Sequence, residues 1–233
     1  MRTTVSTTVK TTIHATGLAT DNDVTVDAGA VRLEGVFGPA PEAVGTVIFA
    51  HGSGSGRKSP RNQYVARQLQ RSGMSTLLLD LLTPAEDQVY RTRFDIALLE
   101  PRLAAACAWV RARQGDAALP IGLFGASTGA AVALRVAAGH PGEIAAVVSR
   151  GGRPDLAGVA ALETLRSPTL LIVGGNDDQV IGLNEAAREL ILCDARLEIV
   201  AGATHLFEES GALEQVAALA AAWFRSHFGA PPA

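Results

Sequence analysis

The stretch that decides the fold is residues 119–134, LPIGLFGASTGAAVAL. An apolar run typical of a strand leads into GASTG at 125–129, and an Ala-rich segment suited to a helix follows. The pentapeptide matches G-x-S-x-G, which in a strand–turn–helix context places a serine on a tight, strained turn. Gly125 and Gly129 omit side chains that would collide as the helix packs back onto the strand. A Gly-rich turn with a capping serine is the alternative, and the flanking segments favour Ser127 as a nucleophile.

Strand-like and helix-like segments alternate along the rest of the chain. Strands are predicted at 44–50, 74–80, 119–126, 144–150, 167–175 and 195–202, and helices at 60–72, 94–115, 127–139, 184–192 and 213–228. Residues 23–37 alternate apolar and polar side chains around Gly29, which predicts an antiparallel hairpin. The fold class is therefore α/β, with a mostly parallel sheet, an antiparallel N-terminal hairpin, helices on both faces and no cap domain.

The 233 residues predict one domain at 23–233, preceded by a Thr-rich arm at 1–22 that is either an edge strand or a loose arm. The arm lacks the apolar core of a secretion signal, and no apolar run reaches the roughly 18 residues of a membrane span. We expect a cytoplasmic monomer or homodimer that binds no membrane. The net charge of −3 shows no basic excess for nucleic acid. Cys107 and Cys193 lie in apolar, helix-like segments and are expected to be buried, reduced thiols.

A serine hydroxyl needs a base, and His205 is the best placed of the five histidines. It stands in VAGATHLFEE, just after the last strand, and open α/β sheets hold their reactive groups at that end of the strands. The other four are His14, His51, His140 and His227. An orienting carboxylate is offered by Asp177 and Asp178, directly after a buried strand. Neighbouring turn residues point in different directions, so one reaches His205 and the other is free to cap the next helix. We favour Asp177.

With these residues in view, the chain resembles the α/β-hydrolases, and among them the small lidless dienelactone hydrolases. The resemblance covers roughly residues 23–228. It rests on VIFAHGSGSG at 47–56, GLFGASTGAAVAL at 122–134, LLIVGGNDDQV at 170–180 and GATHLF at 202–207. The order Ser127, Asp177, His205 matches this fold. Dienelactone hydrolases proper use a cysteine nucleophile, whereas position 127 is serine, which favours ordinary serine-esterase chemistry over lactone specificity.

The glycine-rich loop HGSGSGRKSP at 51–60 is predicted to hold an oxyanion. A phosphate-binding P-loop would need glycine in place of His51 and lysine in place of Arg57, and the dinucleotide pattern also fails at Arg57. The resemblance implies that this loop supplies one oxyanion N–H group, from Ser53 or alternatively Gly52, and that Thr128 supplies the other.

Basic residues follow two predicted strand ends: Arg57, Lys58 and Arg61 after the glycine loop, and Arg150 and Arg153 in SRGGRPD. They form either a solvated rim or a set of side chains that bind an acidic group of the substrate, because guanidinium groups suit carboxylate and phosphate. No His, Cys or Asp cluster has the spacing of metal ligands, and no organic cofactor is expected.

The sequence therefore predicts a serine hydrolase that cleaves carboxylic esters of small substrates, neutral or anionic, through an acyl-enzyme intermediate. The same triad also serves a thioesterase, a lactonase, an amidase or an acyltransferase. A hydrolase fold that binds an acidic ligand without catalysis is the alternative from another class.

Overall fold

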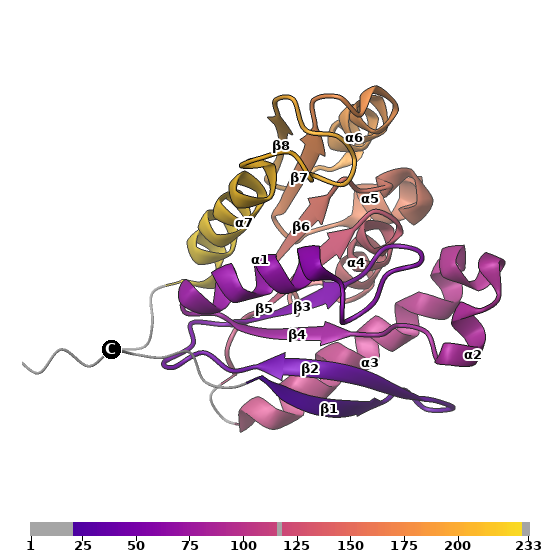
Figure 1. Ribbon diagram of the computed structural model, residues 1–233, viewed down its shortest axis with the longest axis vertical. Coiled ribbons are helices and arrows are strands. Elements are labelled where there is room, and N and C mark those ends of the chain that lie inside the picture. Colours follow the sequence, from indigo (N-terminus) through magenta and orange to yellow (C-terminus); the bar gives the residue numbers. More distant parts are fainter. Residues whose placement is uncertain (1–20, 116–117, 230–233) are drawn as a thin grey trace, which may run out of the picture.

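The computed structural model describes residues 21–115 and 118–229. Eight strands form one sheet in the spatial order β1-β2-β4-β3-β5-β6-β7-β8 (Figure 1). They are β1 (Asn22–Asp27), β2 (Arg32–Gly38), β3 (Thr46–Ala50), β4 (Ser75–Leu79), β5 (Ile121–Ala126), β6 (Ala146–Arg150), β7 (Thr169–Gly174) and β8 (Ala195–Val200). The β1–β2 hairpin pairs antiparallel, and all strands from β3 to β8 run parallel. The predicted sheet is confirmed.

Helices cover both faces of this sheet (Figure 1). They are α1 (Pro60–Arg71), α2 (Pro84–Asp87), η1 (Tyr90–Phe94), α3 (Ile96–Gln114), α4 (Thr128–Gly139), η3 (Pro154–Ala157), α5 (Val159–Thr164), α6 (Asp178–Leu190) and α7 (Ala212–Phe228). The helices α1 and α7 pack on one face, and α3, α4, α5 and α6 pack on the other. The described segments between strands contain no cap domain, as the sequence predicts.

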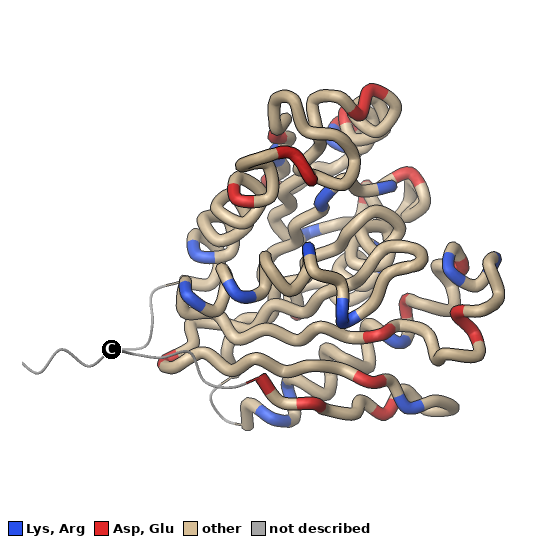
Figure 2. Tube along the Cα trace, in the orientation of Figure 1, with Lys and Arg blue, Asp and Glu red and all other residues tan. Residues whose placement is uncertain are grey.

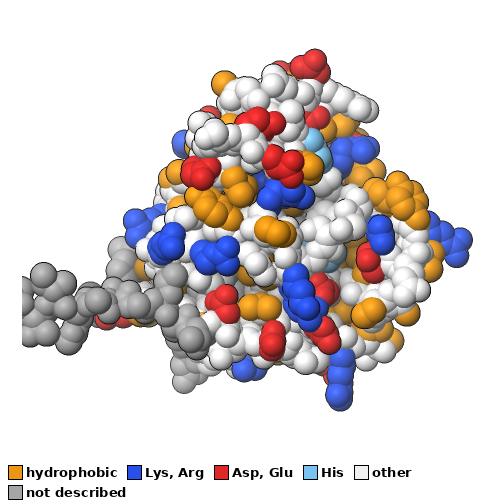
Figure 3. Space-filling model, viewed as in Figure 1, with side chains coloured by type: hydrophobic (Ala, Val, Ile, Leu, Met, Phe, Trp, Pro, Cys, Tyr) orange, Lys and Arg blue, Asp and Glu red, His pale blue; other side chains and the backbone are white. Residues whose placement is uncertain are grey.

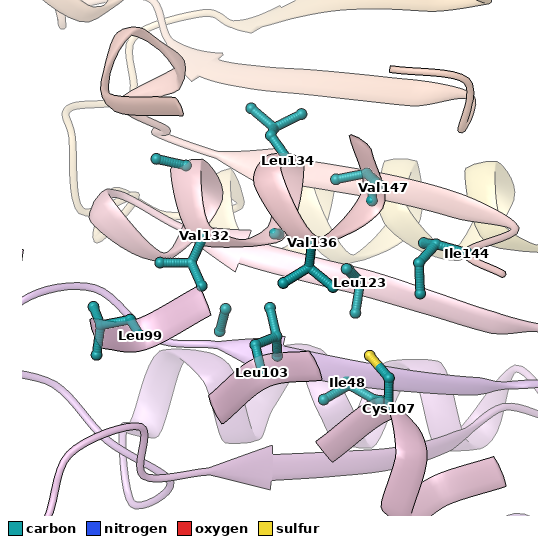
Figure 4. Close-up of a cluster of buried hydrophobic side chains, with 14 of the residues drawn as sticks. Ile48, Leu99, Leu103, Cys107, Leu123, Val132, Leu134, Val136, Ile144 and Val147 are labelled. Carbon is teal, nitrogen blue, oxygen red and sulfur yellow. The ribbon is translucent and has the colours of Figure 1, made fainter. Parts of the chain in front are cut away.

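The strands β3, β4, β5, β6 and β7 are buried along their whole length, which explains their unbroken apolar runs. Alternate side chains of one strand enter opposite layers. In β5, Leu123 packs toward α3 and α4 in the cluster that holds Cys107 (Figure 4), whereas the Phe124 ring contacts the tilted ring of Phe49 in the layer beneath α1 and α7. The Cys107 thiol is free and buried, and burial raises its pKa to about 12.

The helix α1 begins where its capping sequence predicts. The Ser59 hydroxyl accepts a hydrogen bond from the Asn62 N–H, and Pro60 occupies the first helical position. This start determines where the glycine-rich loop ends and the first helix covers the sheet.

Three local predictions are wrong. The helix α6 starts at Asp178 and not at 184. The added residues 178–183 include Gly182 and two β-branched residues, which disfavour a helix, but burial of Val180 and of the next residue, Asn184, stabilises it. Residues 84–94 form α2 and η1, which the periodicity missed. The signal for α2 is its capping box, in which the side chains of Thr83 and Glu86 bond each other's backbone N–H groups. Cys193 lies after α6 and not in a helix; its thiol is free and partly buried.

Charged residues of both signs are spread along the chain, without a basic stripe (Figure 2). In the part of the chain that the structure describes, no helix has the length and hydropathy needed to cross a membrane. The predictions for the arm at 1–22, including His14, fall almost entirely outside the described residues, which begin at 21.

The turn between β5 and α4 depends on two close backbone approaches. A Cβ at Gly129 would overlap the carbonyl oxygens of Ala50 and His51 at the end of β3, and one at Gly125 would overlap the backbone of Ala130. Backbone atoms cannot move aside as a flexible side chain can. Glycine is therefore required at both positions of the pentapeptide.

We predict that Gly129→Ala lowers the free energy of unfolding by about 1–3 kcal/mol, because the added methyl group forces β3 and α4 apart. Urea denaturation of the purified variant measures this change. Gly139→Ala is the matched control at the other end of α4, where an added Cβ meets nothing within 4 Å. It should leave stability unchanged or raise it by up to about 1 kcal/mol. Equal stability of the two variants would contradict this account of the turn.

Candidate active site

Ser127 lies on a sharp bend between β5 and α4. Its backbone has φ 50° and ψ −122°, a conformation that L residues rarely adopt. The bend is held from the neighbouring strand, because the Ser127 N–H donates to the Arg150 carbonyl at 3.1 Å. The Ser127 carbonyl in turn accepts from the N–H groups of Ala130 at 3.0 Å and Arg153 at 3.2 Å. These bonds hold the serine at the carboxyl end of the sheet, at the amino end of α4.

The side chains of His205 and Asp177 are in contact at the same edge of the sheet. The distance from His205 Nδ1 to Asp177 Oδ2 is 2.7 Å, and the two side chains are 38% and 16% exposed. Asp177 follows β7, whereas His205 lies in the loop between β8 and α7. That loop passes close over the end of β7, where Gly174 leaves room for its carbonyl oxygens and the Asn176 N–H donates to Ala203 at 2.9 Å.

Gly151 brings the histidine next to the serine turn. This residue has φ +50°, and a Cβ placed on it would lie 3.4 Å from His205 Nδ1. Its neighbour Arg150 is the residue whose carbonyl holds Ser127. Among the described residues neither the Ser127 hydroxyl nor His205 Nε2 has a hydrogen-bond partner. Such contacts often shorten only when substrate binds. The sequence reasoning missed Gly151, and its place in SRGGRPD after a strand is the signal.

The glycine loop packs directly against Ser127. A Cβ on Gly52 would lie 3.1 Å from the Ser127 Cβ, so a side chain at position 52 would press on the serine turn. The N–H groups of Ser53 and Thr128 have no partner among the described residues, and Thr128 is the first residue of α4, where helical N–H groups are unpaired. Thr128 directly follows Ser127, and Ser53 follows Gly52, the loop residue that packs on the serine, so these two N–H groups are candidate oxyanion donors.

His51 is buried and fastens this loop to the strand end next to it. Its Nδ1 lies 2.9 Å from the Gly52 carbonyl, and its Nε2 accepts the Leu81 N–H at 2.9 Å. These partners need a neutral ring with its proton on Nδ1. Burial lowers the pKa of His51 below its ordinary value of 6.5. The sequence placed this histidine at the loop without assigning it a role.

Asp80 anchors the far half of the loop, a role that the sequence reasoning did not assign. Its Oδ1 accepts the Arg57 N–H at 2.6 Å, and the Arg57 guanidinium forms ion pairs with Asp80 and Glu34. The signal for Asp80 was its position at the end of the apolar strand segment MSTLLLD.

The four arginines predicted to bind substrate have different surroundings. Arg57 is engaged by two carboxylates, and Arg153 is paired with Asp155 at 2.8 and 2.7 Å. Arg61 donates through one nitrogen to Glu208 at 2.6 Å. Arg150 is not a solvated rim residue: it is 8% exposed, and its Nε and Nη1 lack partners among the described residues.

A cavity of about 600 Å³ opens beside the glycine loop and reaches Ser53. Its charged lining residues are Arg32, Lys58, Arg61, Glu34, Asp80 and Asp87. Figure 3 shows the same mixture, with basic and acidic side chains interspersed over this face. Within the described ranges no group of three or more His, Cys, Asp or Glu residues is placed to hold a metal ion.

Comparison with known proteins identifies the family. The sequence model of a family described as an alpha/beta hydrolase domain matches residues 43–222 of this chain. The chain belongs to the α/β-hydrolase family. The crystal structure of dienelactone hydrolase from Anabaena variabilis ATCC 29413 is 50% identical to this hydrolase, with a TM-score of 0.85, over 89% of this chain and 98% of that one. The predicted resemblance is confirmed.

Two further comparisons bear on the hydrolase. Est1E from Butyrivibrio proteoclasticus superposes with a TM-score of 0.73 over 87% of this chain and 97% of its own, but at 16% identity this shows a common fold alone. Putative phosphoribosyl transferases of two Mycobacterium tuberculosis strains are 51% identical over 211 residues, which is 91% of this chain and 47% of theirs. The hydrolase spans about half the length of these curated relatives.

The neutral His51 makes the hydrolase sensitive to acid. An unfolded chain takes up a proton on His51 near pH 6.5, and the folded chain resists it, so the free energy of unfolding falls as the pH drops below about 6.5. We predict that His51→Gln, which does not titrate, loses less stability between pH 7.5 and 5.5 than the wild type. Thermal denaturation at each pH measures the difference. His140→Gln, on the surface, should follow the wild-type profile, and identical profiles for all three proteins would contradict the proposed role of burial.

Proposed function

We propose that the chain is a serine hydrolase that cleaves carboxylic esters of small substrates through an acyl-enzyme intermediate. The observation that carries this proposal is the pairing of a strained Ser127 bend with the 2.7 Å contact between His205 and Asp177 at the same sheet edge. Strain of this kind, about 1–3 kcal/mol, concentrates at functional turns. Membership of the α/β-hydrolase family supports hydrolysis as the reaction class.

In the proposed first step, Ser127 Oγ attacks the ester carbonyl carbon, and its proton passes to His205 Nε2. Asp177 accepts the Nδ1–H bond, selects this tautomer and stabilises the imidazolium that forms. The carbonyl oxygen becomes an oxyanion that accepts hydrogen bonds from the N–H groups of Ser53 and Thr128. Each such donor is worth about 3–4 kcal/mol in the transition state. The partial positive charge at the start of α4 adds to this stabilisation.

Collapse of the tetrahedral intermediate breaks the ester bond, and His205 returns its proton to the leaving alcohol. Water then attacks the acyl-enzyme while His205 takes up one of its protons. The second collapse releases the carboxylic acid and restores the Ser127 hydroxyl. Every proton moves between the substrate, water and two side chains of this chain, so no cofactor takes part in the proposed reaction.

A thioesterase, lactonase, amidase or acyltransferase would use the same groups, and rates on matched oxygen esters, thioesters, lactones and amides separate these alternatives. The phosphoribosyl transferase activity in the relatives' name belongs to proteins about twice as long. We do not carry it over to this chain, because its glycine loop packs on Ser127 and lacks a phosphate-loop pattern.

The free thiols Cys107 and Cys193 fit the reducing cytoplasm that we propose as its location.

We predict that a fluorophosphonate probe adds once to the wild-type protein and not to Ser127→Ala, because only an activated serine displaces fluoride from phosphorus. Intact-mass spectrometry detects the adduct. The matched control is Ser53→Ala, which keeps the backbone N–H and should still be labelled. A wild-type protein that is folded and unlabelled would exclude the proposed nucleophile.

Asp177→Asn should lower kcat by about 10³–10⁴-fold, since an amide favours the wrong tautomer of His205. The neighbouring Asp178 is exposed and forms the first turn of α6, so Asp178→Asn should keep kcat within about twofold of the wild type. Steady-state hydrolysis of 4-nitrophenyl acetate compares them. Similar losses in both variants would refute the assignment of Asp177 as the orienting carboxylate.

A further inference from the structure

Two guanidinium groups lie close together beside the proposed site. Arg150 ends β6, and its side chain lies on the same face of the sheet as Val148, toward α1 and α7. Its guanidinium carbon is 5.8 Å from the ring centroid of Phe207, in the loop that carries His205. Arg61 stands in the first turn of α1, near enough for its charge to act on Arg150.

These two cations lack sufficient anionic partners in the described structure. The Nε and Nη1 atoms of Arg150 and the Nε of Arg61 are buried without a hydrogen-bond partner. The carboxylate in contact is Glu208, which pairs with Arg61 and is itself 61% exposed. A buried, unpaired charge is costly, and burial together with the Arg61 charge lowers the pKa of Arg150 to about 10. Arg150 therefore remains protonated at neutral pH, with unused donors.

We propose that Arg150 and Arg61 bind a carboxylate or phosphate group of the substrate while Ser127 attacks its ester bond. This inference rests on the proposed function. The position supports it, since the Arg150 carbonyl holds the Ser127 N–H and the next residue, Gly151, contacts His205. An anionic group bound between these two arginines would accept hydrogen bonds from the buried donors. Its binding would also orient the rest of the substrate, including the ester carbonyl that Ser127 attacks.

Other basic groups near the site do not provide such a position. Arg57 is neutralised by Asp80 and Glu34, and Arg153 by Asp155. Apart from Arg61, the cavity beside the glycine loop has two basic lining residues, Arg32 and Lys58, against the acidic Glu34, Asp80 and Asp87, so it offers no excess of positive charge. Among the arginines predicted to bind substrate, Arg150 and Arg61 are the two with buried guanidinium donors that have no hydrogen-bond partner among the described residues.

The first experiment compares paired esters, one of which carries an anionic group that its neutral partner lacks. The pairs are 4-nitrophenyl hemiglutarate with its methyl ester, 4-acetoxybenzoate with its methyl ester, and 4-acetoxyphenyl phosphate with phenyl acetate. The first pair places a carboxylate on the acyl side, and the other two place a carboxylate or a phosphate on the alcohol side. The wild type should prefer the charged ester in at least one pair. Arg150→Gln should reduce kcat/KM for that ester about 10- to 100-fold more than for its neutral partner, as expected for hydrogen bonds to a charged group.

Three variants serve as controls. Arg150→Lys keeps the charge and should retain part of the preference, which a purely structural role for Arg150 does not predict. Arg61→Gln should weaken the preference in the same direction. Arg153→Gln, whose partner is Asp155, should change both rates of a pair by the same factor. A wild type without preference in any pair, or Arg150→Gln with equal losses on both esters, would overturn the proposal.

The second experiment measures anion binding without catalysis. Isothermal titration of Ser127→Ala with inorganic phosphate and with glutarate should give a dissociation constant at least 10-fold lower than in Ser127→Ala with Arg150→Gln. Equal constants would refute the anion site even if the fluorophosphonate labels the wild type. Selective binding in an unlabelled protein would support the anion site and refute the esterase function, so the two failures are distinguishable.

Discussion

The bend at Ser127 is the constraint on which the rest of the structure depends. A non-glycine residue at φ 50° costs about 1–3 kcal/mol, and it persists because the surroundings allow no other path. Gly125 and Gly129 permit backbone contacts that no side chain would tolerate, and the Arg150 carbonyl holds the Ser127 N–H from the adjacent strand. The buried helix α4 and the central sheet stabilise the strained turn.

Loops that follow different strands meet around this bend because parallel strands end at a common edge. The glycine loop after β3 is fastened to the residues just after β4, because His51 accepts the Leu81 N–H and Asp80 accepts the Arg57 N–H. The loop after β8 is held by Asp177 and by close contact with the end of β7. Each loop is thus positioned by a strand other than its own, which makes the edge rigid.

The distribution of charge around the edge is uneven for a physical reason. Two partly buried arginines, Arg57 and Arg153, have carboxylates beside them, and these ion pairs leave little net attraction for a ligand. Arg150 is buried on the sheet, where its guanidinium lies near the ring of Phe207 and within range of the Arg61 charge. Burial without a counter-ion distinguishes this residue from the others, and the distinction lies in its surroundings.

The sequence by itself determined the α/β class, the parallel sheet, the serine turn and the candidates His205 and Asp177, since these follow from periodicity, glycine spacing and position after strands. It did not resolve the short elements at 84–94 or the start of α6, where burial outweighs weak local propensity. Only the tertiary structure decided which arginine is unpaired and which residues fasten the glycine loop. Those outcomes depend on contacts between residues far apart in the chain, such as Arg57 with Asp80 and Arg61 with Glu208, which local pattern does not encode.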